Sequence, residues 1–281
     1  MSLVRCLVCG TLETVLPAGE PGSGGLGGCE DAYLPHADPG GLTGRLARRS
    51  RDRKTAVAGR WMEEGARLVD VGCGSGGFLA ACRRRWPHRG LTGMEPDPGA
   101  ASAAAERGFQ VLTAGLDAPL PGAVREAGLY TLWHVLEHVE DPLEALVHLR
   151  EALAPGGRIL VVVPNARAWE RSLWGRHTVS WDPPRHRWHL SPRGLASLAE
   201  KAGLEAAGRF TLFSDDVYDG AASLRWLLYR RAWTDRSSVR GRAALTFGLA
   251  AAPLGALVGM LAPRDRRASM GWVLERAGRG C

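Results

Sequence analysis

One segment, an apolar run that ends near an acid and then turns through closely spaced glycines, constrains the fold of this chain more than any other. The run covers residues 67–71, and glycines follow at positions 72, 74, 76 and 77. Glycine carries no Cβ, so it allows a tight turn and lets a ligand approach the backbone. A strand, a glycine-rich turn and a helix in this order predict the first unit of a nucleotide-binding α/β sheet.

The glycines alone do not choose the ligand. Gly72, Gly74 and Gly77 also satisfy the G-x-G-x-x-G pattern of dinucleotide-binding proteins. A pyrophosphate at a helix N-terminus needs amide donors and positive potential, and the carboxylate of Asp70 would repel it. S-adenosylmethionine has no phosphate and carries an ammonium and a sulfonium, which a nearby carboxylate suits. Asp70 therefore favours this cofactor over a nicotinamide dinucleotide.

The segment resembles the first motif of class I S-adenosylmethionine-dependent methyltransferases. The resemblance implies an α/β fold with a doubly wound, Rossmann-like, seven-stranded sheet whose last strand is antiparallel. It also implies that four residues contact the methionine part of the cofactor: Asp70, Gly72, Gly74 and Gly76.

Further residues of the cofactor site follow the second and third predicted strands. Glu95 ends the second strand, where an acid can accept hydrogen bonds from ribose hydroxyls. Both candidate cofactors contain ribose, so Glu95 supports nucleoside binding without separating them. The resemblance assigns the loop after the third strand to adenine, and Leu116 and Asp117 are its nearest matches. Asp117 capping a turn is the alternative.

The string Trp133–His138 follows the fourth predicted strand. Ligands of an open α/β sheet bind beyond the carboxyl ends of its strands, so Trp133 and His134 are placed to face cofactor and acceptor. His134 is the candidate general base, because an imidazole can take the proton of an acceptor hydroxyl. A packing role for His134 is the alternative. The spacing of His134 with Glu137 and His138 could also suggest a metal site. We do not expect one, because consecutive residues of a helical turn face different directions.

An aromatic loop follows the fifth predicted strand and contains Trp174 and the string 181–191, with Asp-Pro-Pro-Arg-His and His-Leu-Ser-Pro. It resembles the acceptor loop of a methyltransferase subgroup that begins with a zinc-knuckle-like segment. His186 and His189 are candidate catalytic residues in this loop. Aromatic rings with convergent polar groups suit a specificity lid. A packed connector to the following helix is the alternative.

The N-terminal segment contains a Cys-x-x-Cys pair, Cys6 and Cys9, which resembles one zinc knuckle. A closed zinc site needs four ligands, and the nearby candidates are Cys29 and His36. We therefore expect no complete zinc site and predict an irregular N-terminal arm. The scattered cysteines and the lack of a signal-peptide pattern favour the cytoplasm.

Alternating strand and helix patterns from about residue 42 predict a parallel sheet covered on both faces. One predicted helix ends at Pro155-Gly156-Gly157, and the next strand covers Arg158–Val163. The predicted organisation is an arm over 1–41, a methyltransferase core over 42–213, a helical apolar and basic insertion over 214–269, and a last strand with a tail over 270–281.

Residues 243–262 are uncharged and flanked by arginines, and reach the length of a membrane span. A span is excluded, because the strand predicted after it must rejoin the sheet. Pro253 and many small residues favour burial inside the protein or in a homodimer over peripheral attachment to a membrane surface. The net charge of +7 alone does not indicate nucleic acid, since no interleaved aromatic and basic platform accompanies it.

The sequence thus predicts a methyltransferase, with O-methylation of a small-molecule, sugar or glycan-related acceptor. Two alternatives stay open at this point. One is an NAD-dependent oxidoreductase with the same glycine pattern. The lack of an obvious Tyr-x-x-x-Lys or similar hydride-transfer constellation in the sequence argues against it. The other is a non-catalytic subunit that binds S-adenosylmethionine.

Overall fold

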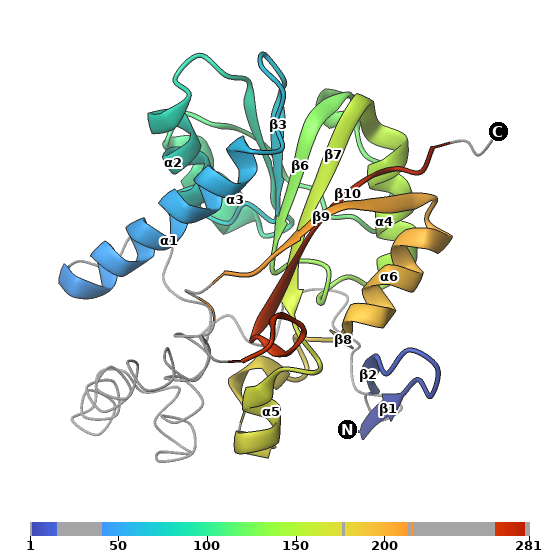
Figure 1. Cartoon of the computed structure of the whole chain (residues 1–281). Coiled ribbons are helices and arrows are strands. Elements are labelled where there is room, and N and C mark those ends of the chain that lie inside the picture. Colours follow the sequence, from blue (N-terminus) through green and yellow to red (C-terminus); the bar gives the residue numbers. More distant parts are fainter. Residues whose placement is uncertain (1, 16–40, 176–177, 213–214, 216–261, 279–281) are drawn as a thin grey trace. The chain divides into compact units, whose positions relative to one another are not determined.

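Seven strands form one mostly parallel sheet in the order β5-β4-β3-β6-β7-β10-β9 (Figure 1). The computed structural model describes residues 2–15, 41–175, 178–212, 215 and 262–278. The strands are β3 (Leu68–Val71), β4 (Leu91–Met94), β5 (Gln110–Leu112), β6 (Ala127–Trp133), β7 (Leu153–Pro164), β9 (Leu204–Phe210) and β10 (Ser269–Arg276). The last strand is antiparallel, so the predicted fold class is confirmed.

The order of the strands places a switch point beside β3. The chain moves outward from β3 through β4 to β5, and then returns to the other side of β3 with β6. Loops that leave the carboxyl ends of β3 and β6 therefore run in opposite directions and open a crevice for ligands. Asp70 pairs in register with Gly93 of β4 and Thr131 of β6, so it lies at this point.

Helices flank the sheet, with α1, α2 and α3 on one side and α4 on the other (Figure 1). Their bounds are α1 (Gly41–Gly59), α2 (Gly77–Arg85), α3 (Pro98–Glu106), α4 (Pro142–Ala152), α5 (Trp169–Trp174) and α6 (Pro192–Lys201). Asp97 and Asp141 cap α3 and α4, and each precedes a proline at the first helical position. The carboxylate accepts otherwise unpaired helical amides, while proline lacks the amide that would remain unpaired.

The prediction for the start of β7 is wrong. Helix α4 ends at Ala152 and β7 begins at Leu153, so Pro155-Gly156-Gly157 lies inside the strand. The register between β6 and β7 shifts here, between Ala127 and Leu129. A Cβ on Gly157 would lie 2.9 Å from the carbonyl oxygen of Ala127, so the glycine permits a close backbone approach at a bulge.

The N-terminal residues are also more ordered than predicted. β1 (Ser2–Arg5) and β2 (Leu12–Val15) form an antiparallel hairpin, and β2 pairs with β8 (Trp188–His189) in a three-stranded sheet. Residues 2–15 are therefore not an irregular arm. A hairpin of four-residue strands is marginally stable alone, and pairing with β8 as a third strand stabilises it.

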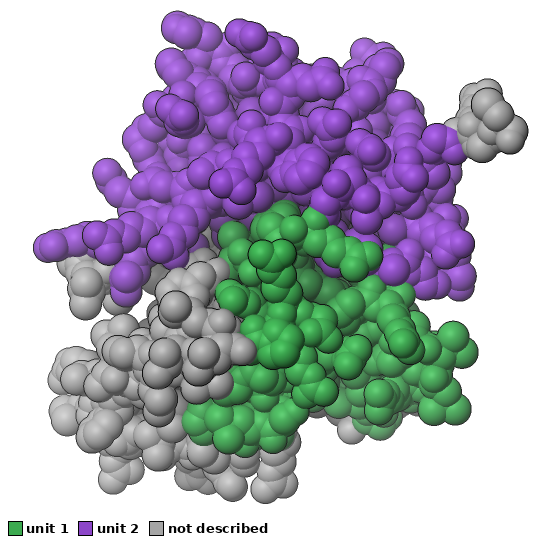
Figure 2. Space-filling model, in the orientation of Figure 1, with its two compact units in different colours: residues 1–33, 163–195, 209–271 green, residues 34–162, 196–208, 272–281 purple. Residues whose placement is uncertain are grey.

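The chain divides into two compact units, each discontinuous in sequence (Figure 2). Unit 1 contains residues 1–33, 163–195 and 209–271, and unit 2 contains 34–162, 196–208 and 272–281. This division differs from the predicted linear order of arm, core, insertion and tail. Most of the predicted insertion, residues 216–261, lies outside the described residues. Among the described residues, no helix combines the length and apolar character needed to span a membrane.

Candidate cofactor site and candidate catalytic residues

The glycine turn after β3 has the backbone that only glycine adopts readily. Gly72, Gly74 and Gly76 have φ of 68°, 52° and 77°. A Cβ on Gly72 would lie 2.6 Å from Cγ2 of Val135, whereas one on Gly74 would meet no atom within 4 Å. The first glycine is therefore required by packing within the protein, and the second leaves open space beside its backbone.

Asp70 is a buried carboxyl at the end of β3, with only 2% of its surface exposed. Its Oδ1 accepts a hydrogen bond of 2.7 Å from the Thr131 hydroxyl. Burial raises the pKa of Asp70 to about 7, and the Thr131 hydrogen bond and the charge of Lys54 oppose this rise. A buried carboxyl of this kind is stabilised in its ionised form by a cationic ligand.

Glu95 joins the loop after β4 to the glycine turn. The buried carboxylate accepts the Gly74 amide through Oε2 at 2.8 Å and the Asp97 amide through Oε1 at 3.0 Å. A carboxylate is an acceptor only, so Glu95 suits a ligand that offers hydroxyl donors. The structure thus links the acid predicted to bind ribose directly to the predicted cofactor loop.

Trp133, at the end of β6, contacts the aromatic ring of Phe78 and the cationic side chain of Lys54. Its ring meets that of Phe78 edge-on with centroids 5.2 Å apart, and Lys54 Nζ lies 5.0 Å from its centroid. Among the described residues, the buried Nε1 of Trp133 has no hydrogen-bond partner. Lys54 and Thr131 were missed by the sequence analysis, although Lys54 is one of only two lysines in a chain rich in arginine.

The loop assigned to adenine has one buried and one exposed residue. Leu116 is buried, and its carbonyl oxygen lies 3.1 Å from Nδ1 of His148 on α4. Asp117 is exposed. His148 therefore holds the backbone of this loop against α4.

His134 and Glu137 form a pair in the turn after β6. Nδ1 of His134 lies 3.3 Å from Oε1 of Glu137, whose side chain is fully buried, while the His134 side chain is one-third exposed. The His134 backbone has φ of 61° and donates its amide to Val162 at 2.9 Å. Non-glycine residues rarely adopt this conformation, and such residues concentrate at functional sites. Glu137 can orient the imidazole and fix which nitrogen carries the proton.

The loop after β7 is held by contacts within unit 1. His186 Nδ1 lies 2.9 Å from the Ser180 carbonyl oxygen, and Asp182 forms an ion pair with Arg185. His189 is buried, and its Nε2 lies 2.9 Å from the Thr14 hydroxyl. The two predicted histidines therefore differ, since His186 is partly exposed and His189 connects the loop to the N-terminal hairpin.

Cys6 and Cys9 lie in the turn of that hairpin. Backbone hydrogen bonds close the turn and connect Cys6 to both Gly10 and Thr11. Cys6 is exposed, and amide hydrogen bonds, first from Cys9 and then from Val8, lower the pKa of its thiol. Such a turn favours a thiolate, which is the form that binds metal. Cys29 and His36, the other candidate ligands, lie outside the described residues.

The geometry of the β3 crevice fits S-adenosylmethionine. A buried carboxyl suits a cation, a second carboxylate at the glycine turn suits the hydroxyl donors of ribose, and any Cβ at position 74 would fill the space beside the backbone. Nothing in this set favours a pyrophosphate, which two carboxylates would repel. The residues present therefore agree with the cofactor predicted from the sequence.

Comparisons with known proteins agree with this geometry. A methyltransferase domain family matches residues 43–207. The chain is 30% identical over 122 residues to the trans-aconitate 2-methyltransferase of Rhodopseudomonas palustris (strain BisA53), covering 42% of this chain and 46% of the relative. It is 31% identical over 179 residues to the ubiquinone biosynthesis O-methyltransferase of Caulobacter sp. (strain K31), covering 59% of this chain and 68% of the relative.

A solved structure extends the likeness to most of the chain. The putative sarcosine dimethylglycine methyltransferase from Galdieria sulphuraria superposes with a TM-score of 0.56 at 15% identity, over 84% of this chain and 87% of that chain. This likeness to a solved structure shows the fold alone. The chain matches less than half the length of the trans-aconitate 2-methyltransferase named above. Because the family match covers more than half of the chain, the protein belongs to the class I S-adenosylmethionine-dependent methyltransferases, with S-adenosylmethionine as its cofactor.

Proposed function

We propose that this protein transfers a methyl group from S-adenosylmethionine to an oxygen atom of a small-molecule acceptor. The observation that carries the proposal is the buried Asp70 carboxyl beside the glycine turn, with Glu95 bonded to the same turn. When bound, the cofactor supplies an electrophilic methyl carbon on a sulfonium sulfur. Asp70 holds the positive end of the methionine part, and Glu95 holds the ribose.

The chemistry left to the protein is positioning and proton transfer. The Glu137 carboxylate, 3.3 Å from Nδ1 of His134, favours the proton on that nitrogen and leaves Nε2 of the neutral imidazole as the base. His134 then takes the proton that the acceptor hydroxyl loses as its oxygen is methylated. The buried position of Glu137 keeps the imidazole orientation fixed.

Oxygen as the acceptor atom is supported by the likeness to the Caulobacter relative, an O-methyltransferase. The acceptor class is a small molecule, a sugar or a glycan-related compound, with Trp174, Trp181 and His186 as candidate contacts. His189, which is buried against Thr14, is better placed to position this loop than to touch the acceptor. The homodimer is a separate proposal, which light scattering tests.

Mass spectrometry of a metabolite pool incubated with the protein and methyl-labelled S-adenosylmethionine tests this function. The expected result is label on an oxygen of one small molecule. Binding of S-adenosylhomocysteine without any labelled product would instead indicate the non-catalytic subunit. Calorimetry with NAD in place of S-adenosylhomocysteine should show no binding at comparable concentrations.

The Glu95→Ala variant should bind S-adenosylhomocysteine roughly tenfold to a hundredfold more weakly than the wild type. It loses two ribose hydrogen bonds of about 1 kcal/mol or more each. Isothermal titration calorimetry measures the change, and Glu106→Ala, which removes an exposed acid of α3, is the matched control. Unchanged affinity in the Glu95 variant would show that the ribose is held elsewhere.

Purified protein should contain less than one zinc ion per chain, and mild chelation should remove it without unfolding unit 2. Cys6 and Cys9 provide two of the four ligands that a closed zinc site needs. Elemental analysis before and after chelation, with circular dichroism as the folding measurement, checks this. One tightly held zinc per chain would show that further ligands complete the site.

A further inference from the structure

The loop after β5 has one polar attachment to the rest of the described chain, and the proposed reaction gives that attachment no role. We propose that His148 of α4 is a positioning residue for the purine of the cofactor. By holding this loop, residues 115–120, it presents the backbone group that receives the base. This inference rests on the proposed function, since it takes S-adenosylmethionine as the cofactor, and it adds selectivity for the base to that function.

The order of the strands places the base of the cofactor at this loop. β3, β4 and β5 are parallel neighbours, so their carboxyl ends lie along one edge of the sheet, about 5 Å apart from strand to strand. The Glu95 amide donates to the Leu112 carbonyl oxygen at 3.0 Å, which joins the proposed ribose site to the end of β5. A ligand with its methionine part at Asp70 and its ribose at Glu95 therefore extends its base toward the loop after β5.

This loop has little structure of its own. Neither helix nor strand covers residues 115–120, and the side chains of Leu116 and Leu120 are buried. Within the described part of the chain these six residues make one hydrogen bond, in which Nδ1 of His148 lies 3.1 Å from the Leu116 carbonyl oxygen. Apolar contacts have no preferred direction, whereas a hydrogen bond fixes the direction of a peptide group. His148 therefore orients the peptide that joins Leu116 to Asp117.

The orientation of this peptide decides which backbone group faces a ligand. A trans peptide is planar, so the Leu116 carbonyl and the Asp117 amide point in opposite directions. With its carbonyl turned toward His148, the peptide turns the Asp117 amide away from α4. That amide has no partner among the described residues, and Asp117 is exposed. It can donate to a purine nitrogen that accepts, such as N1 of adenine, whereas hypoxanthine carries a hydrogen at N1 and cannot accept there.

His148 is itself held in place, since its side chain is only 9% exposed. A carbonyl oxygen accepts and does not donate, so Nδ1 carries the proton in the contact with Leu116. On the other side of the ring, Nε2 lies 3.8 Å from Oε1 of Glu144, one turn earlier on α4, whose side chain is 61% exposed. This distance exceeds that of a hydrogen bond, and an exposed acid contributes little. The Nδ1 contact is therefore the one that acts on the loop.

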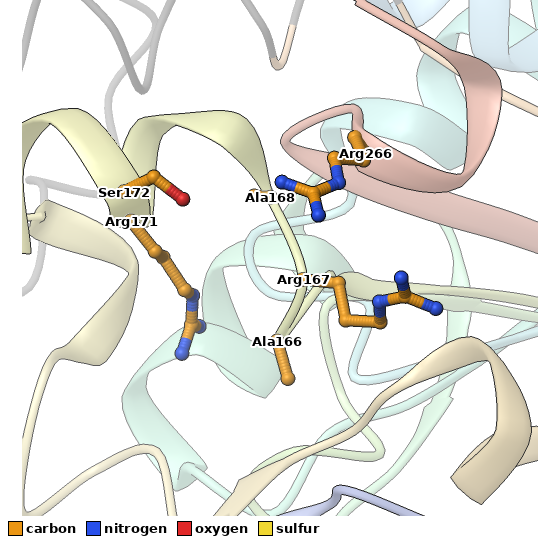
Figure 3. Close-up of a pocket in the computed structure, with 6 residues that line it drawn as sticks. All are labelled: Ala166, Arg167, Ala168, Arg171, Ser172 and Arg266. Atoms are coloured by element: carbon orange, nitrogen blue, oxygen red, sulfur yellow. The ribbon is translucent and has the colours of Figure 1, made fainter.

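The whole arrangement belongs to unit 2, which contains β3, β4, β5, the loop and α4. A separate, arginine-lined pocket of about 220 Å³ belongs to unit 1, and Arg167, Arg171 and Arg266 are among its lining residues (Figure 3). None of the residues that carry the base site lines that pocket. The contact between His148 and the loop is thus a property of a single compact unit.

Titration calorimetry with S-adenosylhomocysteine and S-inosylhomocysteine, in which hypoxanthine replaces adenine, tests the proposal. The wild type should prefer S-adenosylhomocysteine by about tenfold or more. His148→Phe keeps a ring in the buried site but removes the donor to Leu116. It should weaken S-adenosylhomocysteine binding about fivefold or more and change S-inosylhomocysteine binding by less than about twofold, since that ligand does not use the amide.

Two further variants separate the hydrogen bond from packing. His148→Asn places an amide donor close to the position of Nδ1 and should restore most of the preference for adenine. His148→Gln places its amide close to the position of Nε2 and should not restore it. Glu144→Gln is the matched control on the same helix, because it removes the acid near Nε2 and leaves the contact with Leu116 intact, so it should behave like the wild type.

Three outcomes would overturn the inference. One is a wild type that binds both ligands equally, and another is an unchanged ratio of the two affinities in His148→Phe. The third is equal behaviour of His148→Asn and His148→Gln, which would reduce His148 to a packing residue and which decides the question even where His148→Phe does not fold. A partly unfolded preparation lowers the fraction of active protein and leaves the ratio unchanged. Failure of the wild type to bind S-adenosylhomocysteine would refute the proposed function instead.

Discussion

The Asp70→Asn variant should lose at least about a hundredfold in affinity for S-adenosylhomocysteine, and should nevertheless be more stable than the wild type above pH 7. The loss follows because a neutral amide does not pair with the ammonium group of the ligand. The gain follows because an ionised carboxylate is costly to bury. The Thr131 hydroxyl can still donate to the amide oxygen of asparagine, so the local hydrogen bond survives.

The stability effect has a defined pH window. Burial raises the pKa of Asp70 from 3.8 to about 7. Below about pH 4 the group is protonated in both folded and unfolded protein, so it costs nothing. Between about pH 4 and pH 7 the unfolded state ionises Asp70 while the folded state keeps its proton, so stability falls by up to about 4 kcal/mol and levels off above pH 7. The advantage of Asp70→Asn should therefore be clearly smaller at pH 5 than at pH 8.

Urea denaturation at pH 5 and pH 8, together with calorimetry of ligand binding, measures both effects. Asp52→Asn is the control, because Asp52 is an exposed acid whose ion pair with Arg84 contributes little. Wild-type affinity for S-adenosylhomocysteine should also fall as the pH drops below 7, since protonated Asp70 carries no charge. A variant that is less stable at pH 8 and still binds the ligand would contradict the assigned role.

The His134→Ala variant should lower kcat by about a hundredfold or more while leaving S-adenosylhomocysteine affinity within about threefold of the wild type. The loss is expected because His134 is the proposed base and does not hold the cofactor. The measurement is methyl transfer to the acceptor identified by labelling, with calorimetry alongside. His88→Ala, which removes an exposed histidine of the loop after α2, should change neither quantity.

Glu137→Gln separates proton transfer from packing at the same pair. Glutamine keeps the size of the buried side chain but not its charge, so the pH at which kcat rises should move while the cofactor affinity stays constant. If His134→Ala instead loses cofactor affinity and single-turnover chemistry survives, His134 is a packing residue.

The β3 crevice could be predicted from sequence because its signals are local. The acid and glycines of residues 70–76 are adjacent in the chain, and the parallel sheet follows from the alternation of strands and helices. Lys54 and Thr131 could not be found in this way, because their roles depend on which side chains surround Asp70 after folding. A lysine on an arginine-rich helix and a threonine inside a strand look like ordinary surface and core residues.

The Pro-Gly-Gly run at 155–157 illustrates a different limit. Proline and glycine usually end helices, and they also occur where a strand bulges. The sequence does not distinguish these cases, because the deciding contact is between Gly157 and Ala127 of the neighbouring strand. The pairing of β2 with β8 is hidden for the same reason, since it joins two short segments that lie far apart in the chain.

That pairing has a consequence for how the protein is made. Thr14 and His189, which lie within hydrogen-bond distance, are 175 positions apart in the chain. At about 5 to 20 residues per second, β2 leaves the ribosome roughly 10 to 35 s before its partner strand exists. During this interval the edge of β2 that later pairs with β8 is open. Residues 12–15 are therefore made well before they can reach their final place, and chaperones have access to them throughout this interval.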